Sequence, residues 1–330
     1  MEITSLQPQH LEDAARLFAT CYHREREQVP ILPSRHEDSS GILSVLSDLS
    51  RQAPGVAALR NSRLCGYLIG VPIPSFKGTA RGVYCPIWAH AAVGDDGPEI
   101  YRHMYGRISN QWVEDRCLTH AITLYAQDSE AIDVWFRNCF GLLVVDALRP
   151  LDPVSATMSS EVMVRQAGLG DLDLILPLER EHVRYMAGGP IFLPLLETFG
   201  RDECASWLAE PAHTLWLASH NGGAVAYMRS QPPKPDVAYI VSDPGTISIT
   251  GVYVKPQWRG RGIATLLLRH MIEWARSNGY ERCSVDFESQ NMLGSRFWLR
   301  HFQPICYSLI RRLDERIAWA GKDNSTASVY

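Results

Sequence analysis

Two arginines and two glycines alternate at Arg259, Gly260, Arg261 and Gly262, where an apolar, β-branched run gives way to an amphipathic stretch. Glycine lets the main chain turn sharply and approach a ligand closely. At the start of a helix, exposed main-chain N–H groups and the positive end of the helix dipole bind anions. Residues 257–265 therefore predict a site for a phosphate ester, to which the two arginines add positive charge.

The segments on either side of this loop are predicted to be a strand and a helix. Residues 247–256, ISITGVYVKP, are rich in β-branched and aromatic side chains, which favours a strand with Gly251 as a candidate bulge. After the loop, apolar residues recur at helical spacing as far as Asn278 and Gly279, a good C-terminal cap pair. The anion site is thus expected at a strand-to-helix junction.

The loop pattern Q-x-x-G-x-G, residues 257–262, differs from both common phosphate motifs. A Walker A loop needs Gly-Lys-Ser or Gly-Lys-Thr, and a Rossmann fingerprint needs G-x-G-x-x-G with an acidic partner. Together with GVYVKP upstream and NMLGSRFWLRHF at 291–302, the pattern resembles the acetyl-CoA-binding signature of the GNAT superfamily of N-acetyltransferases. The resemblance covers residues 162–313 and implies acetyl-CoA as cosubstrate, with no metal.

A weak internal repeat divides the chain. Trp135 and Arg137 in the first half match Trp298 and Arg300, each 163 residues later. We predict an α+β protein of two tandem GNAT-like domains, 1–152 and 160–330, joined through a Pro-, Ser- and Thr-rich segment. Each domain is expected to be a mixed, mostly antiparallel twisted sheet flanked by helices. Two-copy members of the superfamily are known, mycothiol synthase among them, and this chain is similar in architecture.

The resemblance assigns cofactor roles in the second half. The loop amides are expected to hold the pyrophosphate, and the splayed strand end is expected to pair with the pantetheine arm. For Asn291 the resemblance implies a pantetheine contact, and a helix N-cap is the alternative that can hold as well. The full predicted set is Val252, Tyr253, Val254, Gln257, Arg259, Gly260, Arg261, Gly262, Ile263, Ala264, Thr265, Asn291, Ser295 and Trp298.

Acetyl transfer to an amine requires a neutral amine, donors to the developing oxyanion and protonation of the departing thiolate. Asp286 and Glu288 lie two apart on a predicted strand, so they face the same side at its carboxyl end. Glu288 is the first candidate for the base and Asp286 the second. The alternative is that both are solvated or salt-bridged carboxylates at a strand end.

The family usually carries a tyrosine seven residues after the asparagine, proposed to protonate the thiolate, where this chain has Trp298. An indole N–H donates hydrogen bonds but is not a useful proton donor. Tyr307 and Tyr253 are candidates for this role, with core packing as the alternative for each. A thiolate also leaves readily without a dedicated acid.

The first half keeps the fold signals but not the cofactor signals. Asp95, Asp96 and Glu99 stand where the pyrophosphate would lie, and carboxylates there repel it. Residues 1–152 are therefore predicted to be a degenerate copy. Trp88, His90 and His120 are candidates for lining a remnant pocket, or for buried structural roles.

Composition narrows the function classes. The formal net charge of −4 argues against a nucleic-acid partner, and no apolar run is long enough to cross a membrane. The eight cysteines lie singly, without zinc-binding spacing, as expected for reduced thiols in a cytoplasmic protein. The sequence leaves the oligomeric state open.

The predicted function is acetyl transfer from acetyl-CoA to the primary amine of a small molecule, by direct attack in a ternary complex. An acyl-CoA-binding regulatory module without turnover, or use of another acyl-CoA, are the alternatives. His182 lies on the helix that walls the acceptor site in the family, although a structural or exposed histidine is the alternative there. Acceptor selectivity is expected on that helix and the loop at 187–199.

Overall fold

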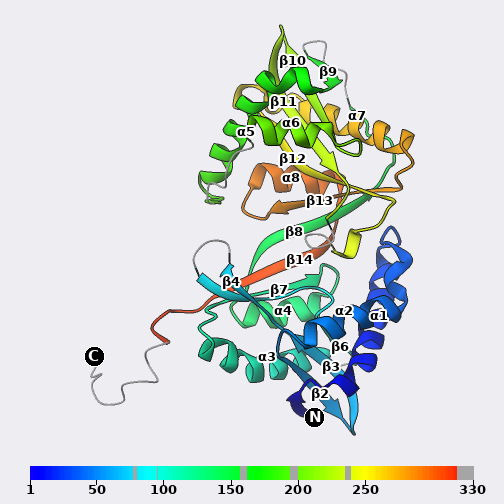
Figure 1. Ribbon diagram of the computed structural model, residues 1–330, viewed down its shortest axis with the longest axis vertical. Helices are drawn as coiled ribbons and strands as arrows, with labels where there is room; N and C mark the ends of the chain where they lie inside the picture. The colour runs from blue at the N-terminus through cyan, green and yellow to red at the C-terminus, as the bar shows by residue number, and fades with distance from the viewer. Residues whose placement is uncertain (77–79, 95, 157–161, 194–199, 235–238, 318–330) are drawn as a thin grey trace. The chain divides into compact units, whose positions relative to one another are not determined.

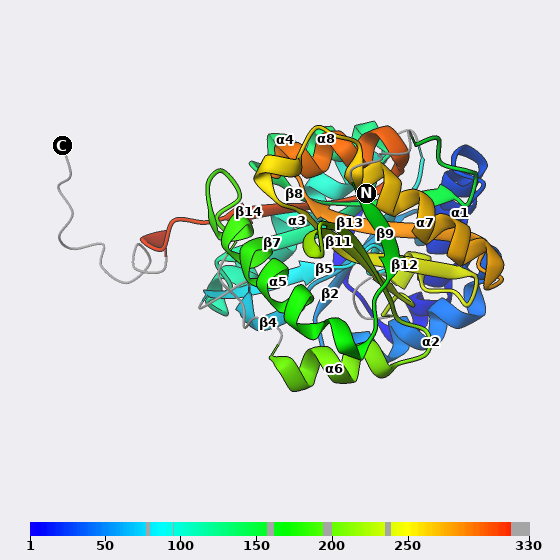
Figure 2. The ribbon, with the colours of Figure 1, turned by 90° about the horizontal axis from the view of Figure 1, so that it is seen from above.

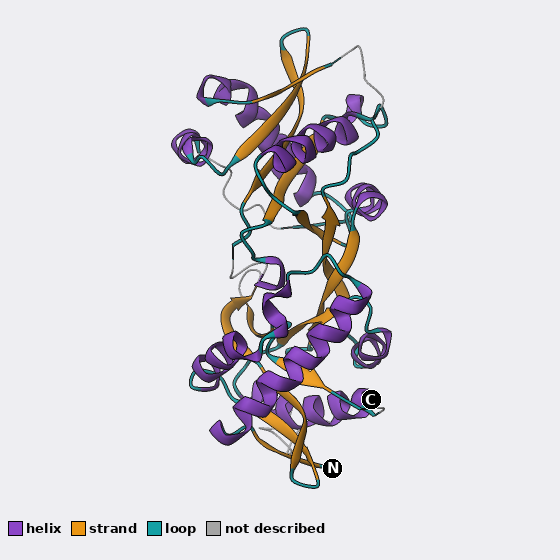
Figure 3. Ribbon diagram, turned by 90° about the vertical axis from the view of Figure 1, so that its right-hand side faces the viewer, coloured by secondary structure: helices purple, strands orange, loops and turns teal. Residues whose placement is uncertain are grey.

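The computed structural model describes residues 1–76, 80–94, 96–156, 162–193, 200–234 and 239–317 (Figure 1). Its contacts divide the chain into two compact units. The first comprises Met1–Val145 with Ile305–Tyr330, and the second comprises Asp146–Pro304. In each unit, strands are flanked by helices (Figure 3).

The second unit contains the predicted loop. Its elements are β9 (Met163–Gln166), α5 (Leu172–Ala187), α6 (Arg201–Ala209), β10 (Thr214–His220), β11 (Gly223–Gln231), β12 (Thr246–Val254), α7 (Ile263–Ser277), β13 (Arg282–Glu288) and α8 (Met292–His301). The strands lie in the order β9, β10, β11, β12, β13; the first four pair antiparallel, and β12 pairs parallel with β13. Helices α5 and α6 lie on one side of these strands and α7 on the other (Figure 2).

The sequence signals for turns and caps in this unit are confirmed. Asn221 and Gly222, with φ of 47° and 80°, close the hairpin between β10 and β11. Helix α7 ends at Ser277, with Asn278 as its cap and Gly279 at φ 81°. Asn221, Gly222 and Gly279 adopt a left-handed backbone, which asparagine and glycine tolerate. This explains why these residue types stand in the hairpin turn and after α7.

The first unit repeats the element order. It contains β1 (Glu2–Ser5), α1 (Leu11–Gln28), α2 (Ser39–Ser50), β2 (Gly55–Arg60), β3 (Arg63–Ile69), β4 (Val71–Phe76), β5 (Ala80–Cys85), β6 (His90–Ala92), α3 (Gly97–Glu114), β7 (Thr119–Tyr125), α4 (Ser129–Arg137) and the first half of β8 (Gly141–Pro150). The counterpart of β12 is interrupted here: β5 pairs parallel with β7, whereas β6 pairs with β3. The tandem α+β fold predicted from the repeat is confirmed.

The last strand of the chain belongs to the first unit. Strand β14 (Gln303–Arg312) pairs antiparallel with β7, from Cys306 opposite Tyr125 to Arg312 opposite Thr119. The two compact units therefore have different boundaries from the predicted domains 1–152 and 160–330. Those predicted boundaries follow the repeat in the sequence. Residues 157–161, which include the end of the predicted linker, lie outside the described residues.

We expect the first unit to depend on β14. Removing it by ending the chain at Pro304 exposes the edge of β7 and deletes the buried Ile305 and Leu309. Each large apolar side chain contributes about 1.5–3 kcal/mol by burial, a large part of the roughly 5–15 kcal/mol that stabilises a domain. Amide hydrogen exchange should show loss of protection in β7, while a chain ending at Ile317 keeps it. Full protection of β7 in the shorter chain would contradict the pairing.

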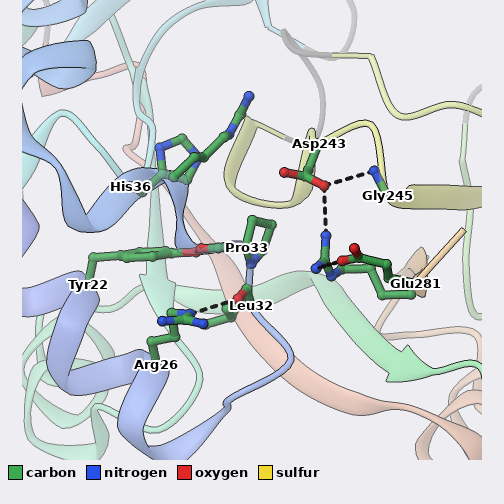
Figure 4. Close-up of polar contacts among 10 residues, drawn as sticks. Tyr22, Arg26, Leu32, Pro33, His36, Asp243, Gly245 and Glu281 are labelled. Atoms are coloured by element: carbon green, nitrogen blue, oxygen red, sulfur yellow. Dashed lines mark hydrogen bonds and ion pairs between the residues drawn. The ribbon is translucent and has the colours of Figure 1, made fainter.

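Glu25 is a buried carboxyl in the first unit. It lies near the end of α1, where Arg26 Nε donates to the Leu32 carbonyl (2.9 Å) and Tyr22 Oη donates to the Pro33 carbonyl (2.5 Å; Figure 4). Glu25 is 3% exposed, and within the described part of the chain its Oε1 has no hydrogen-bond partner. Burial, followed by repulsion from Asp128, raises the pKa of Glu25 to about 7.

The folded state therefore holds this proton more tightly than the unfolded state does. The protonated Glu25 therefore favours the folded state. This contribution to the free energy of unfolding is fully present below pH 4.5, the pKa of Glu25 in the unfolded state, and is lost as the pH rises through about 7, its pKa in the folded state. Glu25→Gln should increase the unfolding free energy of the first unit by about 2–3 kcal/mol at pH 8, and by little at pH 4. Urea unfolding across this range measures the effect, with the exposed Glu12→Gln on the same helix as control. Parallel pH profiles for wild type and Glu25→Gln would contradict it.

Candidate active site

The predicted phosphate loop is an open turn that leads into α7. Gly260 and Gly262 have φ of 75° and 77°, and a Cβ added at either position would meet no atom within 4 Å. The positive φ explains why both positions are glycine. The first hydrogen bond of α7 runs from Leu266 N to Gly262 O (3.0 Å), so the three amides before Leu266 have no partner within the helix. This arrangement can bind an anion.

Strands β12 and β13 are joined at one end and separate at the other. Arg282 and the Gly245 amide both donate to Asp243 Oδ1 at 2.8 Å, which fastens the strand starts together (Figure 4). The parallel pairing described for these strands ends at Ile249 opposite Val285.

Beyond this point β12 follows β11 alone. A register shift leaves Thr250 as an extra residue beside Gly251, which confirms the predicted bulge. Pairing with β11 continues as far as Val254, so the other edge of residues 252–254 faces the gap that opens beside β13. Main-chain groups at such an edge can pair with an extended, amide-containing ligand.

Helix α8 begins beside this gap. Asn291 is its N-cap: Oδ1 accepts from the Gly294 amide (3.0 Å) and from Tyr185 Oη (2.8 Å). The capping role is therefore confirmed. Ser295, one turn later, donates to the Ser289 carbonyl (3.2 Å). Trp298 is 4% exposed and packs against neighbouring phenylalanines, so it is a core residue of this unit.

The two predicted carboxylates lie at the end of β13, where Asp286 is exposed and Glu288 half-buried. Sequence reasoning missed a third carboxyl, Asp146, in the part of β8 that belongs to this unit. Burial, followed by the charge of Asp286, raises the pKa of Asp146 to about 8. No local pattern links Asp146 to Asp286, because they are 140 residues apart in the sequence.

The two candidate tyrosines have different surroundings. Tyr307 lies on β14 in the first unit, opposite Leu124 on β7, and packs against that unit's core. Tyr253 lies on β12 in the second unit, and its hydroxyl donates to Glu181 Oε2 on α5 (3.3 Å). Tyr253 therefore lies beside α5 and the loop of the second unit.

Arg259, the first arginine of the loop, is held against α5. Its Nε donates to the Val254 carbonyl (3.0 Å), and its guanidinium lies 4.6 Å from the ring centre of Tyr185 and 5.7 Å from that of Tyr253. Arg261 lies over Trp258 instead, at 5.0 Å. Cation–π contacts of this kind fix the side chains while leaving their charge in place.

The sequence analysis named His182 but missed the polar residues that accompany it on α5. Glu179, His182 and Tyr185 follow one another at helical spacing and contact β11, β12 and the start of α8. The signal was their position on the apolar stripe of the helix, where polar residues are unusual. Of the predicted selectivity loop at 187–199, residues 194–199 lie outside the described residues.

The first unit fills the corresponding gap with its own side chains. His90 on β6 bonds the Thr123 carbonyl of β7 through Nε2 (2.8 Å) and Tyr101 Oη through Nδ1 (2.9 Å). Burial lowers the pKa of His90 to about 4. His120 is likewise bonded through both ring nitrogens, to Tyr105 Oη and the Cys117 carbonyl, at 2.9 Å each. Both histidines therefore have buried structural roles.

The acidic residues of the first unit's loop differ in their surroundings. Asp96 stands before α3 and forms an ion pair with Arg60, and Glu99 pairs with Arg102 (2.6 Å). Asp95 lies outside the described residues. Trp88 contributes its carbonyl, which accepts from Tyr67 Oη at 2.9 Å.

Comparison with known proteins agrees with this geometry. Residues 189–302 match the model of the acetyltransferase (GNAT) family. A human protein described as probable N-acetyltransferase 16 is 30% identical over 134 residues, which are 37% of this chain and 32% of that protein. The chain thus matches about a third of the length of this curated relative.

Solved structures are similar in fold. A GCN5-related N-acetyltransferase from Sphaerobacter thermophilus has a TM-score of 0.58 at 16% identity, covering 94% of this chain and 95% of that one. A glucosamine N-acetyltransferase region of a fungal β-N-acetylglucosaminidase has a TM-score of 0.53 at 11% identity, with coverage of 94% and 38%.

The chain thus resembles the GNAT family over residues 189–302, in its second half, and the fold of nearly the whole chain resembles that of the Sphaerobacter thermophilus protein. Among the described residues, no helix is long and apolar enough to span a membrane. The same residues contain no group of three or more histidine, cysteine or acidic side chains arranged to hold a metal ion.

Proposed function

We propose that this protein transfers an acetyl group from acetyl-CoA to the primary amine of a small molecule, in a ternary complex. The observation that carries the proposal is the separation of β12 from β13 next to the open, glycine-turned start of α7. Together they offer main-chain partners for an extended amide chain and for a diphosphate. The family match, at residues 189–302, spans both features.

The cofactor is proposed to lie along these main-chain groups. The amides of 259–265 and the dipole of α7, equivalent to about half a positive charge, would hold the pyrophosphate. Val252 and Val254 would pair with pantetheine, beside Tyr253. Asn291 and Ser295 would flank the arm at the start of α8, and Trp298 would support them from the core.

The transfer itself forms one bond and breaks one. The amine nitrogen attacks the thioester carbon, the C–S bond breaks, and the thiolate takes a proton from water or from Tyr253. The amine proton needs an acceptor, for which Glu288 and Asp286 at the end of β13 remain proposed bases. Tyr307 is the second proposed acid. The degenerate first half is proposed to bind no cofactor.

An acyl-CoA-binding module without turnover is the second candidate. The observation that favours it is Trp298, which is buried where the family carries a tyrosine and cannot protonate a thiolate. Another acyl-CoA in place of acetyl-CoA also fits the main-chain site. None of the eight cysteines, all of which lie in the described residues, forms a disulfide, which supports a reducing, cytoplasmic location.

Gly260→Glu tests the cofactor site. The added carboxylate enters open space beside the proposed pyrophosphate, so we expect acetyl-CoA affinity, measured by calorimetry, to fall about 100-fold or more, or roughly 3 kcal/mol. Gly279→Glu is the matched control, because Gly279 has the same positive φ and open surroundings at the other end of α7. Equal affinity in the two variants would remove the site assignment.

Turnover separates the enzyme from the binding module. Thiol release from acetyl-CoA, followed with a chromogenic thiol reagent against a panel of primary amines, should depend on the amine. Binding of acetyl-CoA without any amine-dependent release would instead establish the module.

A further inference from the structure

Four side chains of the second unit form one continuous chain of contacts beneath the proposed acceptor site. Arg229 on β11 donates to Glu179 on α5 (2.7 Å). Glu179 is hydrogen-bonded to Tyr227, and Tyr227 Oη lies 2.8 Å from His182 Nδ1. Tyr227 is fully buried, Glu179 is 4% exposed, and His182 is half-buried. These contacts therefore connect the buried ion pair of Arg229 and Glu179 to the half-buried imidazole of His182.

The hydrogen-bond partners of Glu179, Tyr227 and His182 indicate the tautomer of His182. A carboxylate paired with arginine only accepts, so the single hydroxyl proton of Tyr227 points to Glu179. Tyr227 Oη must then accept from His182, which places the ring proton on Nδ1. Nε2 keeps its lone pair, and it has no hydrogen-bond partner among the described residues. Ordering of a base by a buried partner is the arrangement that positions catalytic imidazoles.

The packing of His182 places it at the gap between β12 and β13. Its ring stacks on Tyr253, with centroids 5.7 Å apart, and Tyr253 lies in the segment of β12 that has left β13. One turn along α5, Tyr185 bonds Asn291 at the start of α8. The α5 face that carries His182 thus covers the point where the strands separate.

Charged and titratable groups surround this ring on three elements. Arg229 and Tyr227 face it from β11 and Tyr253 from β12, and Glu179 and Glu181 share its helix. Burial, followed by the charge of Arg229, lowers the pKa of His182 to about 4. The imidazole is therefore neutral near pH 7, with its lone pair available.

We propose that Nε2 of His182 accepts the proton of the attacking amine, and that Tyr227 and Glu179 act as positioning residues. The proposal rests on the proposed function and selects α5, in place of β13, as the source of the base. As the nitrogen–carbon bond forms, the amine loses a proton to Nε2 and the electron pair of the C–S bond leaves with the thiolate. The imidazolium then returns its proton to solvent.

The test compares kcat, acetyl-CoA affinity and pH dependence among variants of the full chain. His182→Gln should lower kcat about 100-fold or more, because general-base catalysis contributes 10²–10⁴-fold, with acetyl-CoA affinity unchanged. His213→Gln is the matched control, since His213 stacks on Trp207 elsewhere in the same unit. Asp286→Asn and Glu288→Gln, measured alongside, test the two carboxylates on β13 as the competing bases.

A second readout does not require turnover. Nitrogen-15 NMR of labelled histidine should show an unprotonated Nε2 for His182 in the wild type, and a mixture of tautomers in Tyr227→Phe. Tyr227→Phe should also lower kcat while leaving acetyl-CoA affinity intact, and it serves as the second variant if His182→Gln unfolds.

The outcomes separate this proposal from the proposed function. Retained kcat in His182→Gln, or a loss of kcat confined to the two β13 variants, overturns the role of His182 and leaves the acetyltransferase proposal standing. A protonated Nε2 in the wild type also overturns it. Absence of amine-dependent turnover in the wild type removes both.

Discussion

The separation of β12 from β13 after Ile249 and Val285 is the constraint on which the rest of the second unit depends. Two parallel strands that stay paired satisfy each other's main-chain groups and leave no room for a ligand. Here the ion pair of Arg282 with Asp243 holds the strands together at one end, and the bulge beside Gly251 lets them part at the other. The same departure carries the chain into the glycine turn that starts α7, so one distortion creates both parts of the proposed cofactor site.

The first unit has the same strand arrangement but fills it with its own side chains. Its strands part in the same way, because β5 pairs with β7 whereas β6 does not. A histidine bridge, His90 to the Thr123 carbonyl, then occupies the gap with buried protein groups. Buried polar atoms need partners, so a gap without a cofactor is most stable when side chains fill it.

The α5 cluster shows how buried charge can serve a site. An isolated charge in the core is costly, but Glu179 and Arg229 neutralise each other and share a hydrogen bond with Tyr227. Tyr227 in turn contacts His182, whose ring also stacks on Tyr253. A histidine on a helix is thus oriented by residues 45 and 47 positions away on strand β11.

The sequence by itself determined what depends on local backbone chemistry and on repetition. The glycines at 260, 262 and 279 predicted turns because only glycine adopts positive φ cheaply, and the repeat of Trp135 at Trp298 predicted two copies of one fold. Only the tertiary structure decided which unit holds β14 and Tyr307, that Trp298 is core, and that Asp146 approaches Asp286. The tertiary structure also brings Glu179, Tyr227 and Arg229 together next to His182. These contacts join segments that are distant in the sequence. Their energies depend on burial and on the geometry of the partners, and the spacing of residues along the chain predicts neither.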